Sequence, residues 1–123
     1  MPTPIPFLPD LKVASISFGI LSNNFWVIAN IVNAGLQKTP KINPGVYVNA
    51  LNLTPTPGKN EIRVQNNHKL PALPPGTSCT IASLFDRRIL RRENVTHFEI
   101  SADPKNLVKE RNEQNNMAIV RAF

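Results

Sequence analysis

The chain has 123 residues, a length that fits one domain able to bury a core without disulfides or metals. Its hydrophobic fraction of 41% and charged fraction of 18% are those of a globular protein and exclude an intrinsically disordered chain. Fourteen Lys and Arg against eight Asp and Glu give a net charge of +6, which favours acidic polymers, anionic surfaces or nucleic acid as partners.

The chain opens with "MPTPIPFLPD", and we expect residues 1–8 to form an extended, proline-rich segment before a single domain over residues 9–123. The opening lacks the basic region and apolar run of a secretion signal, so the sequence predicts no signal peptide. No run of about 18 apolar residues exists, so no membrane-spanning helix is expected. These features fit either a cytosolic protein or a segment cut from something larger.

The first predicted strand covers residues 10–18, "DLKVASISF". Its apolar residues change parity along the run, because Leu11 and Val13 share one parity while Ile16 and Phe18 share the other. One extra residue between Val13 and Ile16 would return both pairs to the same face. The sequence therefore predicts a β-bulge in this strand.

The second predicted strand covers residues 25–33, "FWVIANIVN", and is apolar on both parities. Such a run is typical of a central strand covered on both faces, with Trp26 as a large core side chain rather than part of a binding cleft. The sequence Asn33-Ala34-Gly35 ends the strand with turn residues, and we expect Gly35 to be free to adopt a positive φ.

Further alternating runs lie between proline-rich and glycine-rich breakers. These predicted strands cover residues 45–53, 60–65, 78–85, 95–102 and 117–123. About seven short strands predict an all-β fold, a sandwich of two antiparallel sheets. A helical turn or two is expected only near residues 105–113. Cys79, the one cysteine, lies in an apolar run and is predicted to be a small buried hydrophobe rather than a catalytic thiol.

Four arginines, Arg87, Arg88, Arg91 and Arg92, lie within "DRRILRRE". Arginine clusters can bind phosphates, sulfates or carboxylates through paired hydrogen bonds. Asp86 and Glu93 partly neutralise this cluster, and the favoured interpretation is a solvated hairpin tip. The alternative is an anion-binding or partner-binding site. Nucleic acid is a less favoured ligand, because no aromatic stacking motif accompanies the basic residues.

No catalytic or cofactor-binding pattern is apparent in the sequence. The two histidines, His68 and His97, lie on different segments, and the five glycines are scattered rather than gathered into a phosphate-binding loop. We therefore expect no catalytic residues and no cofactor.

The stretch "ADPKNLVKERNEQNN", residues 102–116, is rich in side chains that can accept hydrogen bonds. We interpret it as a connector in which the chain crosses from one sheet to the other, with side-chain oxygens satisfying backbone N–H groups. The alternative is a calcium site, because oxygen ligands are available. Its candidate ligands are Asp103, Asn106, Glu110 and Glu113. Their spacing is not that of a known calcium loop, and three basic residues lie among them, so the connector is favoured.

The order of several motifs resembles the CARDB family, the cell-adhesion-related domain found in bacteria. The positions that carry the resemblance are Pro9-Asp10-Leu11, Ile31-x-Asn33-x-Gly35, Leu73-x-x-Gly76 and Asp103 through Asn116. The last of these is the most specific, and the resemblance covers almost the whole chain. Two basic segments, 54–69 and 86–94, depart from the family pattern, and any specialised activity is expected there.

The resemblance implies an immunoglobulin-like β-sandwich of about seven strands, part of an extracellular or cell-surface protein, without catalytic residues. It therefore implies a non-catalytic module that attaches to a protein or surface polymer. The alternative is a basic protein that binds an acidic ligand, such as an anionic glycan, a wall polymer or nucleic acid, through the arginines of residues 87–92. The sequence names neither a ligand nor an oligomeric state.

Overall fold

The computed structural model of the chain describes residues 8–35, 38–39, 45–53, 60–104 and 116–122. These residues form seven strands and one short helix. The strands are β1 (Leu11–Leu21), β2 (Asn24–Asn33), β3 (Val46–Leu53), β4 (Asn60–His68), β5 (Ser78–Asp86), β6 (His97–Ala102) and β7 (Met117–Arg121), and the helix is α1 (Arg87–Arg92). In the described part of the chain, no helix is long and apolar enough to cross a membrane.

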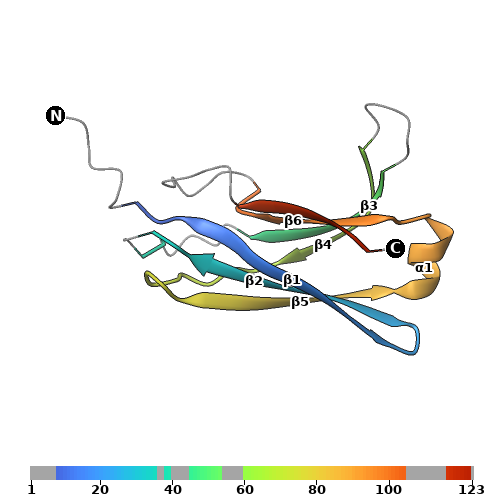
Figure 1. Cartoon of the computed structure of the whole chain (residues 1–123), viewed down its shortest axis with the longest axis horizontal. Coiled ribbons are helices and arrows are strands. Elements are labelled where there is room, and N and C mark those ends of the chain that lie inside the picture. Colours follow the sequence, from blue (N-terminus) through green and yellow to red (C-terminus); the bar gives the residue numbers. More distant parts are fainter. Residues whose placement is uncertain (1–7, 36–37, 40–44, 54–59, 105–115, 123) are drawn as a thin grey trace.

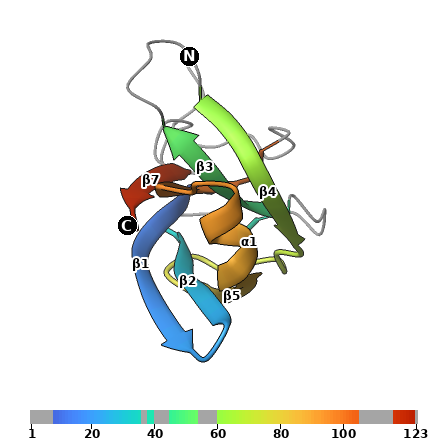
Figure 2. The same cartoon turned by 90° about the vertical axis from the view of Figure 1, so that its right-hand side faces the viewer.

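The strands form two sheets that face each other, and α1 lies at one end between the two layers (Figures 1 and 2). One sheet has the order β1-β2-β5 and the other the order β4-β3-β6-β7, and every pairing is antiparallel. The predicted all-β, immunoglobulin-like antiparallel sandwich of seven strands is therefore confirmed.

Strand β1 contains the predicted bulge. Its register against β2 shifts between Val13 and Ser15, so Ala14 is the extra residue. After the shift, Ile16 lies opposite Ala29 and Phe18 opposite Val27. The bulge thus places Ile16 and Phe18 on the face of the sheet that points to the core, because residues directly opposite in a pair share a face.

Strand β2 is the central strand of its sheet, as expected, but its two faces are not equally covered. Phe25, Val27 and Ala29 are buried, whereas the alternate residues are half-buried. Trp26 belongs to the half-buried set and lies on the outer face, so its predicted place in the core is wrong. The smaller Phe25 occupies the core position because the second sheet packs on that face alone.

Three buried phenylalanines, Phe25, Phe85 and Phe98, form the centre of the core between the sheets, and the partly exposed Phe18 packs at its edge. Phe98 of β6 stacks on Phe25 with ring centroids 5.4 Å apart, and it also contacts Phe85 at 5.1 Å and Phe18 at 5.9 Å. Aromatic pairs in this range add about 0.5–1.5 kcal/mol beyond the area they bury. Phe98 comes from one sheet and the other three from the facing sheet, so this cluster holds the layers together.

At the opposite end from α1, a buried Asn33 joins three segments of the chain. Its side-chain oxygen accepts hydrogen bonds from the backbone N–H groups of Asp10 and Gly35, both at 3.0 Å. Its amide nitrogen donates to the Leu73 carbonyl at 2.9 Å, and its backbone carbonyl accepts from Gly76 at 2.8 Å. Three of the sequence motifs, around residues 10, 33 and 73–76, therefore meet at one amide side chain.

Gly35 lies within this junction, and its role differs from the expected one. Its φ is not in the positive range, whereas Gly76 in the Pro-Pro-Gly turn has φ 75°. A Cβ added at Gly35 would collide with the Leu8 carbonyl oxygen and lie 2.7 Å from the Asp10 nitrogen. A glycine is needed here for the close approach of two backbones.

The chain after β6 does not cross between the sheets as we expected. Strands β6 and β7 are hydrogen-bonded neighbours in the same sheet, so residues 103–116 connect two adjacent strands. The Ala102 N–H donates to the Asn116 carbonyl at 2.8 Å, which closes the connection at its base. The sequence pattern showed a polar connector but carried no information on which sheet receives its far end. Residues 105–115, where a helical turn was expected, lie outside the described residues.

Candidate functional site

The arginine-rich segment folds as helix α1, not as the hairpin tip that the sequence favoured. The Asp86 side chain caps the helix by accepting from the Arg88 N–H at 2.9 Å, and the Glu93 N–H donates to the Ile89 carbonyl at 2.9 Å. Leu90 is buried and anchors the helix to the core. One apolar side chain within six residues is too little to show a helical period in the sequence.

The helix presents its four arginines in different environments. Arg87 is half-buried, and its guanidinium donates to the Ser22 carbonyl at 2.9 Å while its backbone N–H donates to the Asn23 carbonyl. Arg88, Arg91 and Arg92 are exposed. Arg87 therefore fixes the helix against the turn between β1 and β2, whereas the side chains of the other three remain accessible to solvent.

Two acidic residues bracket the helix and neutralise part of its charge. Arg88 lies 3.1 Å from the Asp86 carboxylate, and Arg92 lies 3.5 Å from Glu93. The Arg88 side chain and backbone N–H both donate to Asp86, and these hydrogen bonds hold the pKa of that carboxyl below its ordinary value. In the described part of the chain, the Arg91 side chain makes neither a hydrogen bond nor an ion pair, so its charge is available to a ligand.

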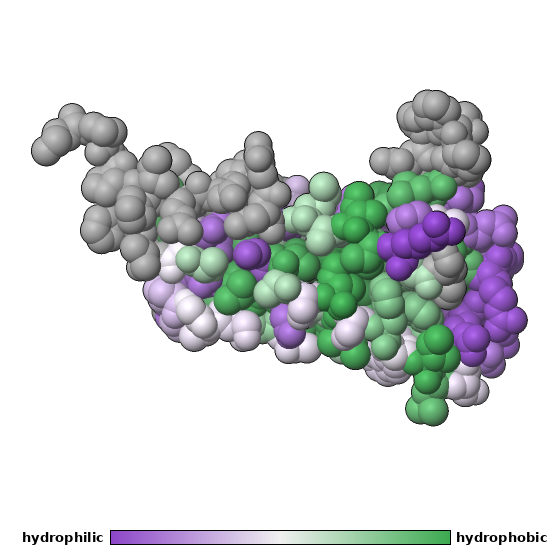
Figure 3. Space-filling model, in the orientation of Figure 1, coloured by the Kyte–Doolittle hydropathy of each residue, from purple (hydrophilic) through white to green (hydrophobic). Residues whose placement is uncertain are grey.

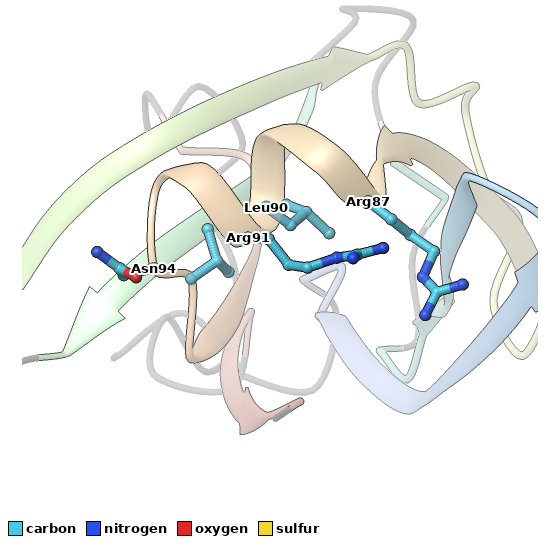
Figure 4. A pocket seen from close by; sticks show the side chains of 5 residues that line it. Arg87, Leu90, Arg91 and Asn94 are labelled. Atoms are coloured by element: carbon cyan, nitrogen blue, oxygen red, sulfur yellow. The ribbon is translucent and has the colours of Figure 1, made fainter.

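A cleft of about 350 Å³ lies beside the helix, lined by Arg87, Leu90, Arg91, Asn94 and Val95. Leu90 and Val95 are buried and form an apolar floor, whereas the two guanidiniums lie at the rim. In Figure 4 the side chains of Arg87 and Arg91 extend in the same direction, towards the blue ribbon of the β1–β2 hairpin. A group with an apolar part and a negative charge fits this arrangement.

The predicted calcium ligands are only partly placed by the structure. Asp103 is buried, has φ 53°, and donates its backbone N–H to the Gly45 carbonyl at 2.9 Å. The other three candidate ligands, Asn106, Glu110 and Glu113, lie outside the described residues. Across the residues that are described, no group of three His, Cys, Asp or Glu side chains comes together as a metal site.

A buried polar cluster that sequence analysis missed joins the two sheets. Ser83 of β5 is fully buried, and its hydroxyl lies 2.9 Å from both the Asn66 amide nitrogen and the His68 Nε2, which come from β4. Burial lowers the pKa of His68, so the neutral imidazole can accept the Ser83 proton. Ser83 has no access to a substrate, and the cluster bonds the edge strands of the two sheets. Strand alternation alone gives no signal for this contact.

Cys79 packs against the edge of the core but is half-buried, so it is less enclosed than the small buried hydrophobe that was predicted. His68 and His97 lie on β4 and β6 and serve separate hydrogen bonds, to Ser83 and to Thr96.

Comparison with known proteins places the chain in a family. A family model for the CARDB domain matches residues 8–120. This chain belongs to the CARDB family. The junction at Asn33 explains the early CARDB-like motifs physically, because they supply the buried amide, the close backbone approach and the tight turn that join three segments. None of the curated proteins matches this chain.

One of the solved structures compared with this chain shows the same fold, and others are less similar. An NMR structure of a "putative cell surface protein (272-376 domain)" from Methanosarcina acetivorans superposes with a TM-score of 0.63 at 18% sequence identity, over 95% of this CARDB domain and 94% of that chain. β-Glucosidase 3B from Thermotoga neapolitana gives a TM-score of 0.46 at 15% identity, over 92% of this chain and 16% of the enzyme. The β-glucosidase of Kluyveromyces marxianus gives 0.40 at 12% identity, over 95% of this chain and 14% of the enzyme.

Proposed function

We propose that this CARDB domain is a non-catalytic module of a cell-surface protein and that it attaches that protein to another protein or to a surface polymer. The observation that carries the proposal is the match to the Methanosarcina domain, which extends over nearly the full length of both chains. The family match over residues 8–120 supports the same function. The motif residues around Asp10, Asn33 and Leu73 serve the framework, and we look for the binding surface among the loops, helix α1 and the strand edges.

Surface display is tested on intact cells of the source organism. Antibodies raised against the purified domain are expected to label unbroken cells, and externally added protease is expected to remove that label. Labelling that appears only after the cells are lysed would refute the proposed location. An antibody against a ribosomal protein serves as the control, because it must label lysed cells alone.

A second candidate function is binding of an acidic polymer, and helix α1 favours it specifically. Arg88, Arg91 and Arg92 are exposed on six residues of helix, in a chain with net charge +6. Several cations on one short element bind a polyanion with a steep salt dependence. We infer that heparin, used as a model polyanion, is retained through this helix.

Three arginine-to-serine substitutions, Arg88→Ser, Arg91→Ser and Arg92→Ser, test the second function when combined in one variant. Arg87 stays because it bonds the Ser22 carbonyl. A matched control replaces the exposed Lys12, Lys38 and Lys69 by serine, which removes the same charge elsewhere. The arginine variant is expected to elute from heparin at clearly lower salt than the control. Equal elution of the two would show that net charge alone retains the protein.

A further inference from the structure

Strand β1 is an edge strand whose second half carries none of the usual protection. It pairs only with β2 in the described part of the chain, and Figure 2 shows it at the outer side of its sheet. Proteins protect free edges with charged side chains, prolines or bulges. Lys12 and the bulge at Ala14 both lie in the first half of β1. No ionisable side chain occurs between Lys12 and Lys38, so no charged residue protects the edge of β1 over residues 15–21.

The same half of β1 exposes apolar side chains that belong to the inner face of the sheet. Phe18 lies opposite Val27 and Ile20 opposite Phe25, and both partners are buried. Nevertheless Phe18 is 38% and Ile20 is 58% exposed. Figure 3 shows apolar surface on this face of the molecule, beside hydrophilic surface at the end where α1 lies. An additional strand next to β1 would cover these side chains.

Positive charge lies at the end of this edge. The hydrogen bond from Arg87 to the Ser22 carbonyl holds α1 against the β1–β2 turn. Arg91, on the same side of the helix, lines the cleft with Arg87 and extends towards the hairpin (Figure 4). The Arg87 guanidinium therefore lies at the turn that ends β1, and Arg91 lies in the cleft beside it.

We propose that the free edge of β1 over residues 15–21 binds an extended acidic segment of a partner protein by strand addition. Backbone hydrogen bonds to β1 would supply the pairing, and alternate apolar side chains of the segment would cover Phe18 and Ile20. A carboxylate of the segment would bind Arg87 and Arg91. This inference rests on the proposed attachment function and names its binding surface.

The direction of the bound segment follows from the sheet. Every strand pair in the described structure is antiparallel, and antiparallel pairing is slightly the more stable. An antiparallel segment places its N-terminal end beside Leu21, which is the end of β1 near α1. The acidic residue of the partner is therefore at the N-terminal end of the bound segment.

Charge disfavours a second copy of this chain as the occupant. Antiparallel pairing of β1 with the β1 of another copy would bring Lys12 of each copy towards Arg87 and Arg91 of the other. Each copy also carries a net charge of +6. Like charges placed opposite each other weaken such a pair, whereas an acidic segment gains from the same charges.

Selection of short random peptides displayed on phage, with the whole purified chain as the target, tests the proposal. Enriched peptides are expected to carry Asp or Glu near the N-terminus, followed by alternating β-branched or aromatic residues. The most enriched peptide, made synthetically, is then titrated against the protein. Amide hydrogen exchange of residues 15–21 is expected to slow when this peptide binds.

Matched variants locate the site. Ile20→Lys is expected to weaken binding of the peptide about tenfold or more, because an apolar contact that the peptide would bury is replaced by a charge on the strand edge. Ile62→Lys on β4, an edge position of similar exposure at 52%, is its control. Arg91→Glu is expected to lower the affinity for the peptide about fivefold, whereas Lys69→Glu should change that affinity by no more than about twofold.

Three outcomes of the peptide experiments would overturn the proposal. These are enrichment of no peptide, enrichment of peptides without an N-terminal acid, and equal loss of binding in Ile20→Lys and Ile62→Lys. A dimer in sedimentation that Ile20→Lys dissolves would assign the edge to a second copy and also refute it. Labelling of intact cells together with failure of the peptide selection would reject strand addition and leave the proposed surface function standing.

Discussion

Replacing the buried Asn33 by alanine is the sharpest test of how this fold is held together. The substitution removes an acceptor from the N–H groups of Asp10 and Gly35 and a donor from the Leu73 carbonyl. Each buried group left without its partner costs about 1–3 kcal/mol. Because part of this cost is recovered by local rearrangement and water entry, we expect Asn33→Ala to lower the free energy of unfolding by about 3–5 kcal/mol.

The matched control is Asn30→Ala in the same strand. Asn30 also makes two side-chain hydrogen bonds, donating to Ser15 and accepting from Thr80, but both are exposed. Water can replace such bonds, so the expected loss is below about 1 kcal/mol. Urea denaturation followed by tryptophan fluorescence measures both variants. The reasoning is refuted if Asn33→Ala costs no more than Asn30→Ala at an unchanged m-value.

Four further outcomes are expected. Gly35→Ala lowers the free energy of unfolding by about 1–3 kcal/mol, because its new Cβ collides with backbone atoms of Leu8 and Asp10. Gly19→Ala is the control and is nearly neutral in the same urea assay, because its new Cβ makes only an ordinary van der Waals contact with Trp26. Leu90→Ala costs about 2–4 kcal/mol and speeds amide exchange of α1, and unchanged exchange would contradict its anchoring role. The free energy of unfolding falls as pH drops below 6.5, the ordinary histidine pKa, because folding lowers the pKa of His68 and the unfolded chain binds the proton more readily. In the His68→Gln variant, the melting temperature should therefore change less between pH 7 and about 5. Calcium added after EDTA leaves the melting temperature unchanged, and a rise of several degrees would indicate an ion bound by the polar connector.

The strands were predictable because period-2 alternation records which side chains face the core. The bulge in β1 follows from the parity change alone, and it is present between Val13 and Ser15. The orientation of β2 was not predictable, since apolar residues occupy both parities and only the position of the second sheet decides that Phe25 faces inward and Trp26 outward.

The candidate site was predictable in composition but not in geometry. Four arginines in one short segment are plain in the sequence, yet the helix that carries them depends on the burial of Leu90 and on the cap at Asp86. The bond from Arg87 to Ser22 joins positions 65 residues apart, and no local pattern encodes such a contact. The Ser83–His68 contact was missed for the same reason, because it depends on how the two sheets face each other.

The junction at Asn33 has a consequence for synthesis on the ribosome. Strands β1 and β2 are joined by a short turn and can pair as soon as they emerge from the ribosome. The side-chain amide of Asn33 cannot donate to the Leu73 carbonyl until that residue, 40 positions later, has also emerged. Until then the nascent hairpin carries one charged side chain, Lys12, and strands β6 and β7 of the facing sheet have not yet been made. We expect this interval to be the moment at which chaperones bind the chain, and a translational pause before residue 73 to reduce the yield of native protein.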